Sequence, residues 1–154
     1  MNKKQHTQLE KIHIRQRDQS DCGVACLATL FKYYEGEASL EKLRELSGTS
    51  KQGTTLMGLF QAANQLGINA EGFEADIDHL KKLNDPVILH VIIDNKLQHY
   101  IIVYGYENEQ FIINDPAKGV SILHEKELAS IWQSKALLLI KPTNKLDKGS
   151  RAKK

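Results

Sequence analysis

The feature that most constrains the fold is a change in the apolar pattern close to Gly67. Before this glycine, apolar residues recur at helical spacing, which is typical of helices that bury one face. After it, apolar residues form short runs separated by polar turns, which is typical of strands. Helices first and an antiparallel meander afterwards predict an α+β fold, in which amino-terminal helices pack on an antiparallel β-sheet.

The boundaries of these elements follow from caps and turns. The expected helices are one that begins at or just after Cys22, one between Ser39 and Gly48, one between Gly53 and Gly67, and short ones over 76–83 and 125–132. The expected strands cover 68–75, 87–94, 98–106, 110–114 and 136–140.

Composition indicates one ordinary globular domain. The 154 residues are 41% hydrophobic and 26% charged, and the net charge of +2 gives no reason to expect nucleic acid as a partner. No apolar run approaches the roughly 20 residues that a membrane span needs. The polar start is not a secretory signal. We expect a flexible segment over 1–11, a folded domain over 12–141 and a basic, disordered linker or tail over 142–154.

Cys22 stands where a polar stretch gives way to an apolar helix. Ser20 or Asp21 can cap the first amides of that helix. The helix dipole and the unpaired N–H groups favour a thiolate there and lower the pKa of a thiol. Gly23 leaves room for another chain to approach the sulfur. The alternative is a small buried core residue, an interpretation that suits Cys26 one turn further on.

The two cysteines also bear on the compartment. They lie four residues apart on one expected helix, so they do not form a disulfide framework. A reducing, cytosolic environment is the natural inference.

A cysteine nucleophile needs a base, and the base needs a third group to orient it. His99 is the best candidate base, because it follows a turn directly and has a rigid strand behind it. The hairpin tip expected near Glu107 and Asn108 is about midway between His99 and Asp115, so the two should lie nearly opposite each other on adjacent strands. The alternative for Asp115 is a residue that merely ends a strand before proline.

The other histidines lie in less suitable places. They occupy the amino-terminal segment (His6, His13), a strand (His90) or expected surface positions (His79, His124). Gln16, shortly before the cysteine, carries an amide that can donate to the oxyanion of an attacked carbonyl. Gln19 competes for this role because it is nearer, and a solvated glutamine is the alternative for either.

In this order and spacing, the motifs resemble those of the bacteriocin-processing cysteine peptidases, the amino-terminal peptidase domains of bacterial ABC exporters. The resemblance covers about residues 12–141. The motifs that carry it are Gln16 with Asp21-Cys22-Gly23-Val24-Ala25-Cys26-Leu27, then 53–59, His99-Tyr100-Ile101-Ile102-Val103 and Asn114-Asp115-Pro116.

The resemblance implies a papain-like fold over 12–141, with Cys22 as nucleophile and His99 as general base and acid. It further implies that Asp115 orients the imidazole and that Gln16 supplies the oxyanion donor, with no cofactor or metal. Members of this family cut a secreted peptide precursor after a double-glycine motif at the end of its leader. They do so on the cytosolic side of the cell membrane, as domains of an exporter.

The rest of an exporter is not recognisable in this sequence. It shows no membrane span and no Gly-x-x-x-x-Gly-Lys phosphate loop, so we expect either an excised peptidase domain, soluble when isolated, or a free-standing relative. The partners implied are the leader peptide and the membrane-spanning and nucleotide-binding domains of an ABC exporter.

Two other functions compete with peptide cleavage. One is a docking domain that binds its cargo without cutting it, as degenerate domains that lack the cysteine do. The other is a metal or redox site built from Cys22, Cys26 and a histidine, although a spacing of four on one helix is uncommon for zinc. Met57, Leu59, Phe60 and Leu66 could form a docking face, but core packing is the commoner use of such a stripe.

Overall fold

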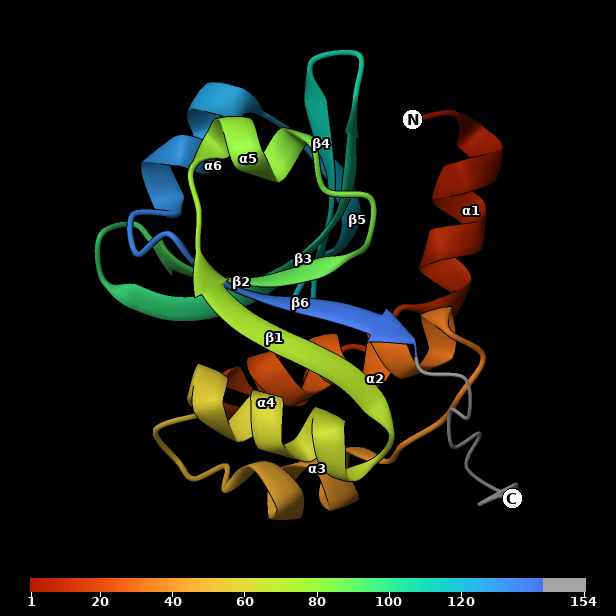
Figure 1. Cartoon of the computed structure of the whole chain (residues 1–154), viewed down its shortest axis with the longest axis vertical. Coiled ribbons are helices and arrows are strands. Elements are labelled where there is room, and N and C mark those ends of the chain that lie inside the picture. Colours follow the sequence, from red (N-terminus) through yellow and green to blue (C-terminus); the bar gives the residue numbers. More distant parts are fainter. Residues whose placement is uncertain (143–154) are drawn as a thin grey trace.

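A computed structural model describes residues 1–142, in which helices lie against an antiparallel six-stranded sheet (Figure 1). The order of the strands in the sheet is β1-β6-β2-β3-β4-β5. The helical elements are α1 (Lys3–Ile12), the 3₁₀ turn η1 (Gln19–Asp21), α2 (Cys22–Tyr33), α3 (Leu40–Ser47), α4 (Leu56–Gln65), α5 (Ile77–Lys81) and α6 (Glu125–Ile131). The strands are β1 (Ile68–Glu74), β2 (Val87–Ile93), β3 (Leu97–Glu107), β4 (Gln110–Asp115), β5 (Gly119–His124) and β6 (Ala136–Pro142).

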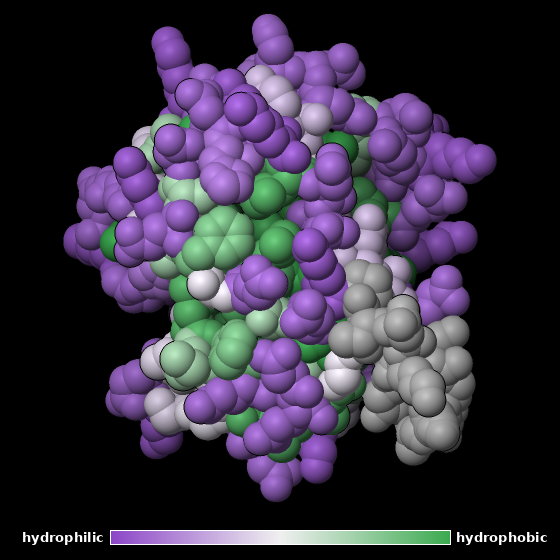
Figure 2. Space-filling view, viewed as in Figure 1, coloured by the Kyte–Doolittle hydropathy of each residue, from purple (hydrophilic) through white to green (hydrophobic). Residues whose placement is uncertain are grey.

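The sheet separates two hydrophobic cores. Successive side chains of a strand point to opposite faces, so Ile88 joins the core beneath α2, α3 and α4 while Val87 and Leu89 join the core beneath α5 and α6. Burying one such side chain contributes about 1.5–3 kcal/mol. Apolar residues on both faces explain why the central strands appear in the sequence as continuous apolar runs. On the face shown in Figure 2, hydrophobic side chains gather left of the centre, between the positions of α5 and α4 in Figure 1.

Capping residues set the ends of α3 and α4 where the sequence predicted them. The Ser39 hydroxyl accepts the Lys42 N–H at 3.1 Å, and α3 ends at Gly48, whose φ of 73° is in the left-handed region. The Thr55 hydroxyl accepts the Gly58 N–H at 3.0 Å at the start of α4.

The stripe on α4 serves mainly the core. Leu59 is fully buried, and Phe60 and Leu66 pack partly buried against the same cluster. Met57 is 62% exposed and is therefore the one member of this stripe that faces solvent.

The start of α2 differs from the predicted cap. The helix begins at Cys22 as predicted, but the Asp21 side chain makes no hydrogen bond to its first amides. A 3₁₀ turn precedes the helix, and Asp18 caps this turn by accepting the Ser20 N–H at 2.9 Å. The Asp21 carboxylate is instead bound by arginines, as described below.

Two elements were not predicted, α1 and β5, and they contact each other. The segment over 1–11, which we expected to be flexible, forms most of α1, none of whose residues is fully buried. Polar contacts hold it on the edge strand: Glu10 accepts the Val120 N–H at 2.7 Å, and the His6 ring lies 3.1 Å from the Val120 carbonyl oxygen. The helix thus satisfies backbone groups on the open edge of the sheet.

The carboxyl-terminal strand is an inner strand of the sheet. β6 lies between β1 and β2 and pairs antiparallel with both (Figure 1). Of the tail predicted over 142–154, the part from residue 143 onward lies outside the described residues. Within residues 1–142, the helices are all too short or too polar to cross a membrane.

Candidate active site

Cys22 lies at the amino-terminal end of α2, where this helix packs closely on β3. Its side chain is 95% buried, since only 5% of the residue is exposed. A Cβ atom added to Gly23 would lie 3.1 Å from Tyr100 Cδ2 and 3.2 Å from Leu59 Cδ1. Gly23 therefore serves the packing of α2 against the sheet, which corrects the prediction that it makes room for another chain.

His99 lies on β3 and is bound by Asp115 at the end of β4. The distance from His99 Nε2 to Asp115 Oδ1 is 2.9 Å, and the imidazole is 97% buried, with 3% exposed. The other ring nitrogen, Nδ1, lies 3.0 Å from Gln19 Nε2, which also contacts Cys22 Sγ at 3.7 Å. The structure therefore brings the three predicted side chains together.

The register of β3 and β4 differs slightly from the prediction. Ile102 is paired with Asn114, so His99 and Asp115 are diagonal neighbours on one face rather than directly opposite. The turn is Asn108-Glu109, both with positive φ, which moves the hairpin tip past its expected position. A bulge between Val103 and Gly105 also shifts the pairing.

The charged forms of His99 and Asp115 stabilise each other. Burial lowers the pKa of His99, but its hydrogen bonds with Asp115 and Cys22 outweigh burial and raise this pKa to about 9. Burial raises the pKa of Asp115, whereas the hydrogen bonds from His99 and from the Ala117 N–H lower it, and the net shift is downward. Asp115 and Cys22 thus favour a protonated imidazole beside an ionised carboxylate.

Of the two glutamines, Gln19 is the one that touches the thiol and imidazole. Its Nε2 lies 3.0 Å from His99 Nδ1, 3.7 Å from Cys22 Sγ and 3.0 Å from the Gln98 carbonyl oxygen. Gln16 lies one hydrogen bond further away, because its Nε2 donates to Gln19 Oε1 at 3.3 Å. The Gln16 N–H donates to the Pro116 carbonyl at 3.0 Å, which ties this segment to the strand end next to Asp115.

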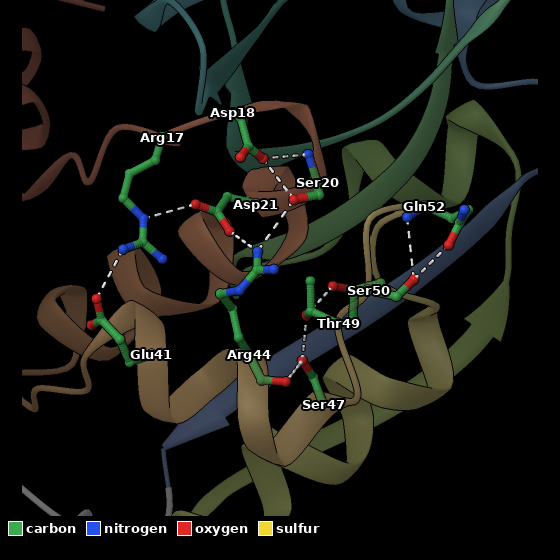
Figure 3. Close-up of polar contacts among 11 residues, drawn as sticks. Arg17, Asp18, Ser20, Asp21, Glu41, Arg44, Ser47, Thr49, Ser50 and Gln52 are labelled. Atoms are coloured by element: carbon green, nitrogen blue, oxygen red, sulfur yellow. Dashed lines mark hydrogen bonds and ion pairs between the residues drawn. The ribbon is translucent and has the colours of Figure 1, made fainter.

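An ionic network fixes the turn before Cys22 (Figure 3). Asp21 is 1% exposed, and its carboxylate accepts from Arg17 Nε at 3.0 Å and from Arg44 on α3. Arg17 also donates to Glu41 at 2.8 Å, and Arg44 donates to the Ser20 hydroxyl at 3.2 Å. A buried carboxylate is stable only when it is paired in this way. The sequence analysis missed both arginines, although Arg17 and Asp21 have the i, i+4 spacing of a local ion pair.

A groove of about 410 Å³ opens beside Cys22. One wall comes from residues 51–56, and the other comes from His90, Gln98 and Tyr100 of the sheet. The two walls are joined because the Tyr100 hydroxyl donates to the Thr54 carbonyl at 2.7 Å. The loop is braced by hydroxyls, with Thr49 Oγ1 at 2.8 Å from Ser47 Oγ and at 2.5 Å from Thr54 Oγ1 (part of this chain is drawn in Figure 3). An extended peptide could lie in such a groove.

Cys26 takes the structural role predicted for it. It is 1% exposed within the core beneath α2, and burial raises the pKa of its thiol. In the part of the chain that the structure describes, no three histidine, cysteine or acidic side chains are grouped so that they could hold a metal ion.

Residues 10–145 match the model of the Peptidase C39 family. The chain is 39% identical to the lactococcin-G-processing and transport ATP-binding protein LagD of Lactococcus lactis subsp. lactis, over 84% of this chain and 18% of LagD. It is 40% identical to the pediocin PA-1 transport/processing ATP-binding protein PedD of Pediococcus acidilactici, over 88% of this chain and 19% of PedD. The chain thus spans about a fifth of the length of these relatives.

Solved structures agree with this assignment. The peptidase domain of Streptococcus ComA, described as a bifunctional ABC transporter in quorum sensing, has a TM-score of 0.77 at 39% identity, covering 84% of this chain and 97% of that domain. A double-glycine-motif protease from an AMS/PCAT transporter, solved with its leader peptide, has a TM-score of 0.76 at 30% identity, covering 84% and 90%. The papain-like fold implied by the resemblance is confirmed, and the chain belongs to the peptidase C39 family of cysteine peptidases.

Proposed function

We propose that this chain cleaves the leader from a bacteriocin-type or other secreted peptide precursor, after a double-glycine motif. The observation that carries the proposal is the hydrogen bond between His99 and Asp115 beside a thiol at a helix start. Support also comes from the relatives, which are named as processing and transport proteins, and from the double-glycine protease with its leader.

The first half of the reaction is acylation of the thiol. Cys22 Sγ forms a bond to the carbonyl carbon of the second glycine while His99 Nδ1 takes the thiol proton. The tetrahedral intermediate then breaks its C–N bond, and His99 gives the proton to the leaving amine. The leader stays attached to Cys22 as a thioester, and the mature peptide is free.

The second half is hydrolysis of the thioester. A water molecule attacks the thioester carbonyl and passes one proton to His99 Nδ1. The C–S bond breaks, the thiolate recovers the proton from His99, and the leader departs with a carboxylic acid at its second glycine, which releases its proton to solvent. The site is then back in its starting state.

Asp115 and Gln16 act around this exchange. Asp115 accepts the Nε2–H of His99, which keeps Nδ1 directed at the thiol and stabilises the imidazolium that forms. Gln16 donates its amide N–H to the oxyanion of the intermediate. In the structure this amide is bound to Gln19, so it has to turn toward the substrate during the reaction.

The proposed setting is the cytosolic side of the bacterial cell membrane. There the chain would act as the peptidase domain of an ABC exporter, with the leader peptide and the exporter's membrane-spanning and nucleotide-binding domains as partners. The relatives support this setting, because they are transport ATP-binding proteins of which this chain matches about a fifth.

The test is cleavage of a synthetic precursor with a Gly-Gly junction, followed by mass spectrometry. We expect one cut after the second glycine, and no cut in a precursor with valine at that position. Cys22→Ala should abolish the cut without changing the melting temperature, whereas the matched Cys26→Ala variant should keep it. Cleavage by Cys22→Ala would refute the proposal, and tight binding without cleavage by the unaltered chain would favour a docking domain.

A further inference from the structure

We infer that Gln19 holds the substrate-free site in its uncharged form and must move before Cys22 and His99 can exchange a proton. This inference rests on the proposed function and assigns Gln19 as a positioning residue. It is carried by the contacts of one side-chain amide with the thiol, the imidazole and Gln16.

The contact with Gln98 fixes which way the amide faces. The atom of Gln19 near the Gln98 carbonyl oxygen lies at 3.0 Å from it. A carbonyl oxygen only accepts hydrogen bonds, so this atom must be the NH₂ group of the amide. The same NH₂ group therefore faces His99 Nδ1, also at 3.0 Å.

This orientation fixes the tautomer of the imidazole. A donor at 3.0 Å requires Nδ1 to accept, so the ring proton is on Nε2, which donates to Asp115 at 2.9 Å. Only the uncharged imidazole has this arrangement. In this state Nδ1 has a lone pair that can take the thiol proton. The N–H of Gln19 is already bound to that lone pair.

Proton transfer conflicts with the bound amide. Once Nδ1 has gained the thiol proton, two N–H donors would face each other across 3.0 Å, which is repulsive. The hydrogen bond from the amide to Cys22 Sγ, at 3.7 Å, offsets only part of this repulsion. Gln19 therefore opposes the ion pair, while Asp115 favours it.

The groups around the imidazole include some that favour its protonated form and one that favours its neutral form. The titratable groups facing the thiol–imidazole pair are Cys26 from α2, Tyr100 from β3, and Asp115 from β4 with Lys118 beyond it. Asp115 and Cys22 favour the protonated ring, whereas the neutral Gln19 amide favours the unprotonated one.

Movement of Gln19 would also release Gln16. Gln19 Oε1 accepts the Gln16 amide at 3.3 Å, and the Gln16 Oε1 atom is buried without a hydrogen-bond partner. Gln19 itself is exposed and lines the groove beside Cys22, so a peptide entering the groove meets it directly. One displacement would thus free the proton acceptor and the oxyanion donor together.

The experiment measures the reactivity of Cys22 in the absence of any peptide. Iodoacetamide alkylation rates are recorded from pH 4 to pH 9 for the full chain and for Gln19→Ala, with mass spectrometry to assign the label to Cys22. Losing one opposing hydrogen bond should convert part of the uncharged thiol–imidazole pair into the thiolate–imidazolium pair near neutral pH. Between about pH 6 and pH 8, alkylation should therefore become roughly 3–10-fold faster.

Gln133→Ala is the matched control, because Gln133 is an exposed glutamine bound to the Ser130 carbonyl on α6. It should reproduce the profile of the unaltered chain. An unchanged rate near neutral pH in Gln19→Ala would overturn the inference, and a slower rate would do so too, since it would show that the amide stabilises the thiolate. Because no precursor is used, a failure to cleave double-glycine peptides would refute the proposed function without affecting this result.

Discussion

The two sides of the site are built in different ways. His99 and Asp115 stand on neighbouring strands of a sheet whose apolar residues fill a core on each face. On the helix side, Gln16, Gln19 and Cys22 come from one short stretch that precedes and begins α2. Pairing between strands positions the sheet side, whereas an ion cluster with α3 positions the helix side.

The sheet side holds its side chains in a fixed orientation, whereas the side chains of the helix side can move. The sheet side presents one hydrogen bond, from His99 to Asp115, whose geometry the strand register already determines. The helix side presents amides that can change partners, and the segment is exposed at Gln19. In the proposed reaction the sheet therefore supplies a fixed base, and the turn before α2 supplies the groups that respond to substrate.

The largest effect should come from breaking the sheet side with Asp115→Asn. The change removes the charge that holds the imidazolium, so the cleavage rate should fall by about 10²–10⁴-fold. Loss of Asp115 also lowers the pKa of His99 from about 9, so the imidazole loses its proton at a lower pH. The alkaline limb of the pH–rate profile should move to lower pH, as steady-state cleavage assays would measure.

The control for this variant is a residue of the same type on the same side that binds no catalytic group. Asp85→Asn lies in the turn before β2 and should leave both the rate and the alkaline limb unchanged. A rate within about threefold of the unaltered chain in Asp115→Asn would contradict the assigned role of the carboxylate.

The sheet side of the site could be predicted more closely from the sequence than the helix side. Strand order along the chain and hairpin spacing placed His99 within one diagonal step of Asp115, because side-chain alternation in a sheet is local and periodic. The missing part was the turn geometry at Asn108, which depends on two residues with positive φ.

The helix side was less predictable. The start of α2 at Cys22 follows from local periodicity, but the partner of Asp21 is Arg44, 23 residues away on another helix. Asp21 was predicted as a cap because only nearby residues were considered. Likewise α1 has no fully buried residue, and its contacts with β5 depend on tertiary structure.

A second variant, Arg44→Ala, breaks the helix side. It leaves the buried Asp21 carboxylate with Arg17 alone, whose side chain is 50% exposed. Removing one partner of a buried charge should lower the free energy of unfolding by about 2–3 kcal/mol, measured by urea denaturation. Because the turn also carries Gln19 and Cys22, the cleavage rate of the folded variant should fall too.

Glu41→Ala is the matched control for the network, since it removes the exposed end of the same chain of ion pairs. Its side chain is 73% exposed, so the midpoint of urea denaturation should stay close to that of the unaltered chain. Equal losses of unfolding free energy in Arg44→Ala and Glu41→Ala would show that the stabilising effect of Arg44 does not come from pairing with the buried Asp21 carboxylate.

Gly23→Ala tests the contact between α2 and β3, which joins the two sides of the site, and we expect it to have the smallest effect. The new Cβ would lie 3.1 Å from Tyr100 and 3.2 Å from Leu59, so α2 and β3 must separate by a few tenths of an ångström. The expected cost is about 1 kcal/mol in unfolding free energy, because crowding is partly offset by the helix propensity of alanine. The cleavage rate should fall about tenfold, since the shift separates Cys22 from His99.

Gly105→Ala is the control, because a Cβ there meets no atom within 4 Å. An equal loss of rate in both variants would contradict this account of the contact between helix and sheet.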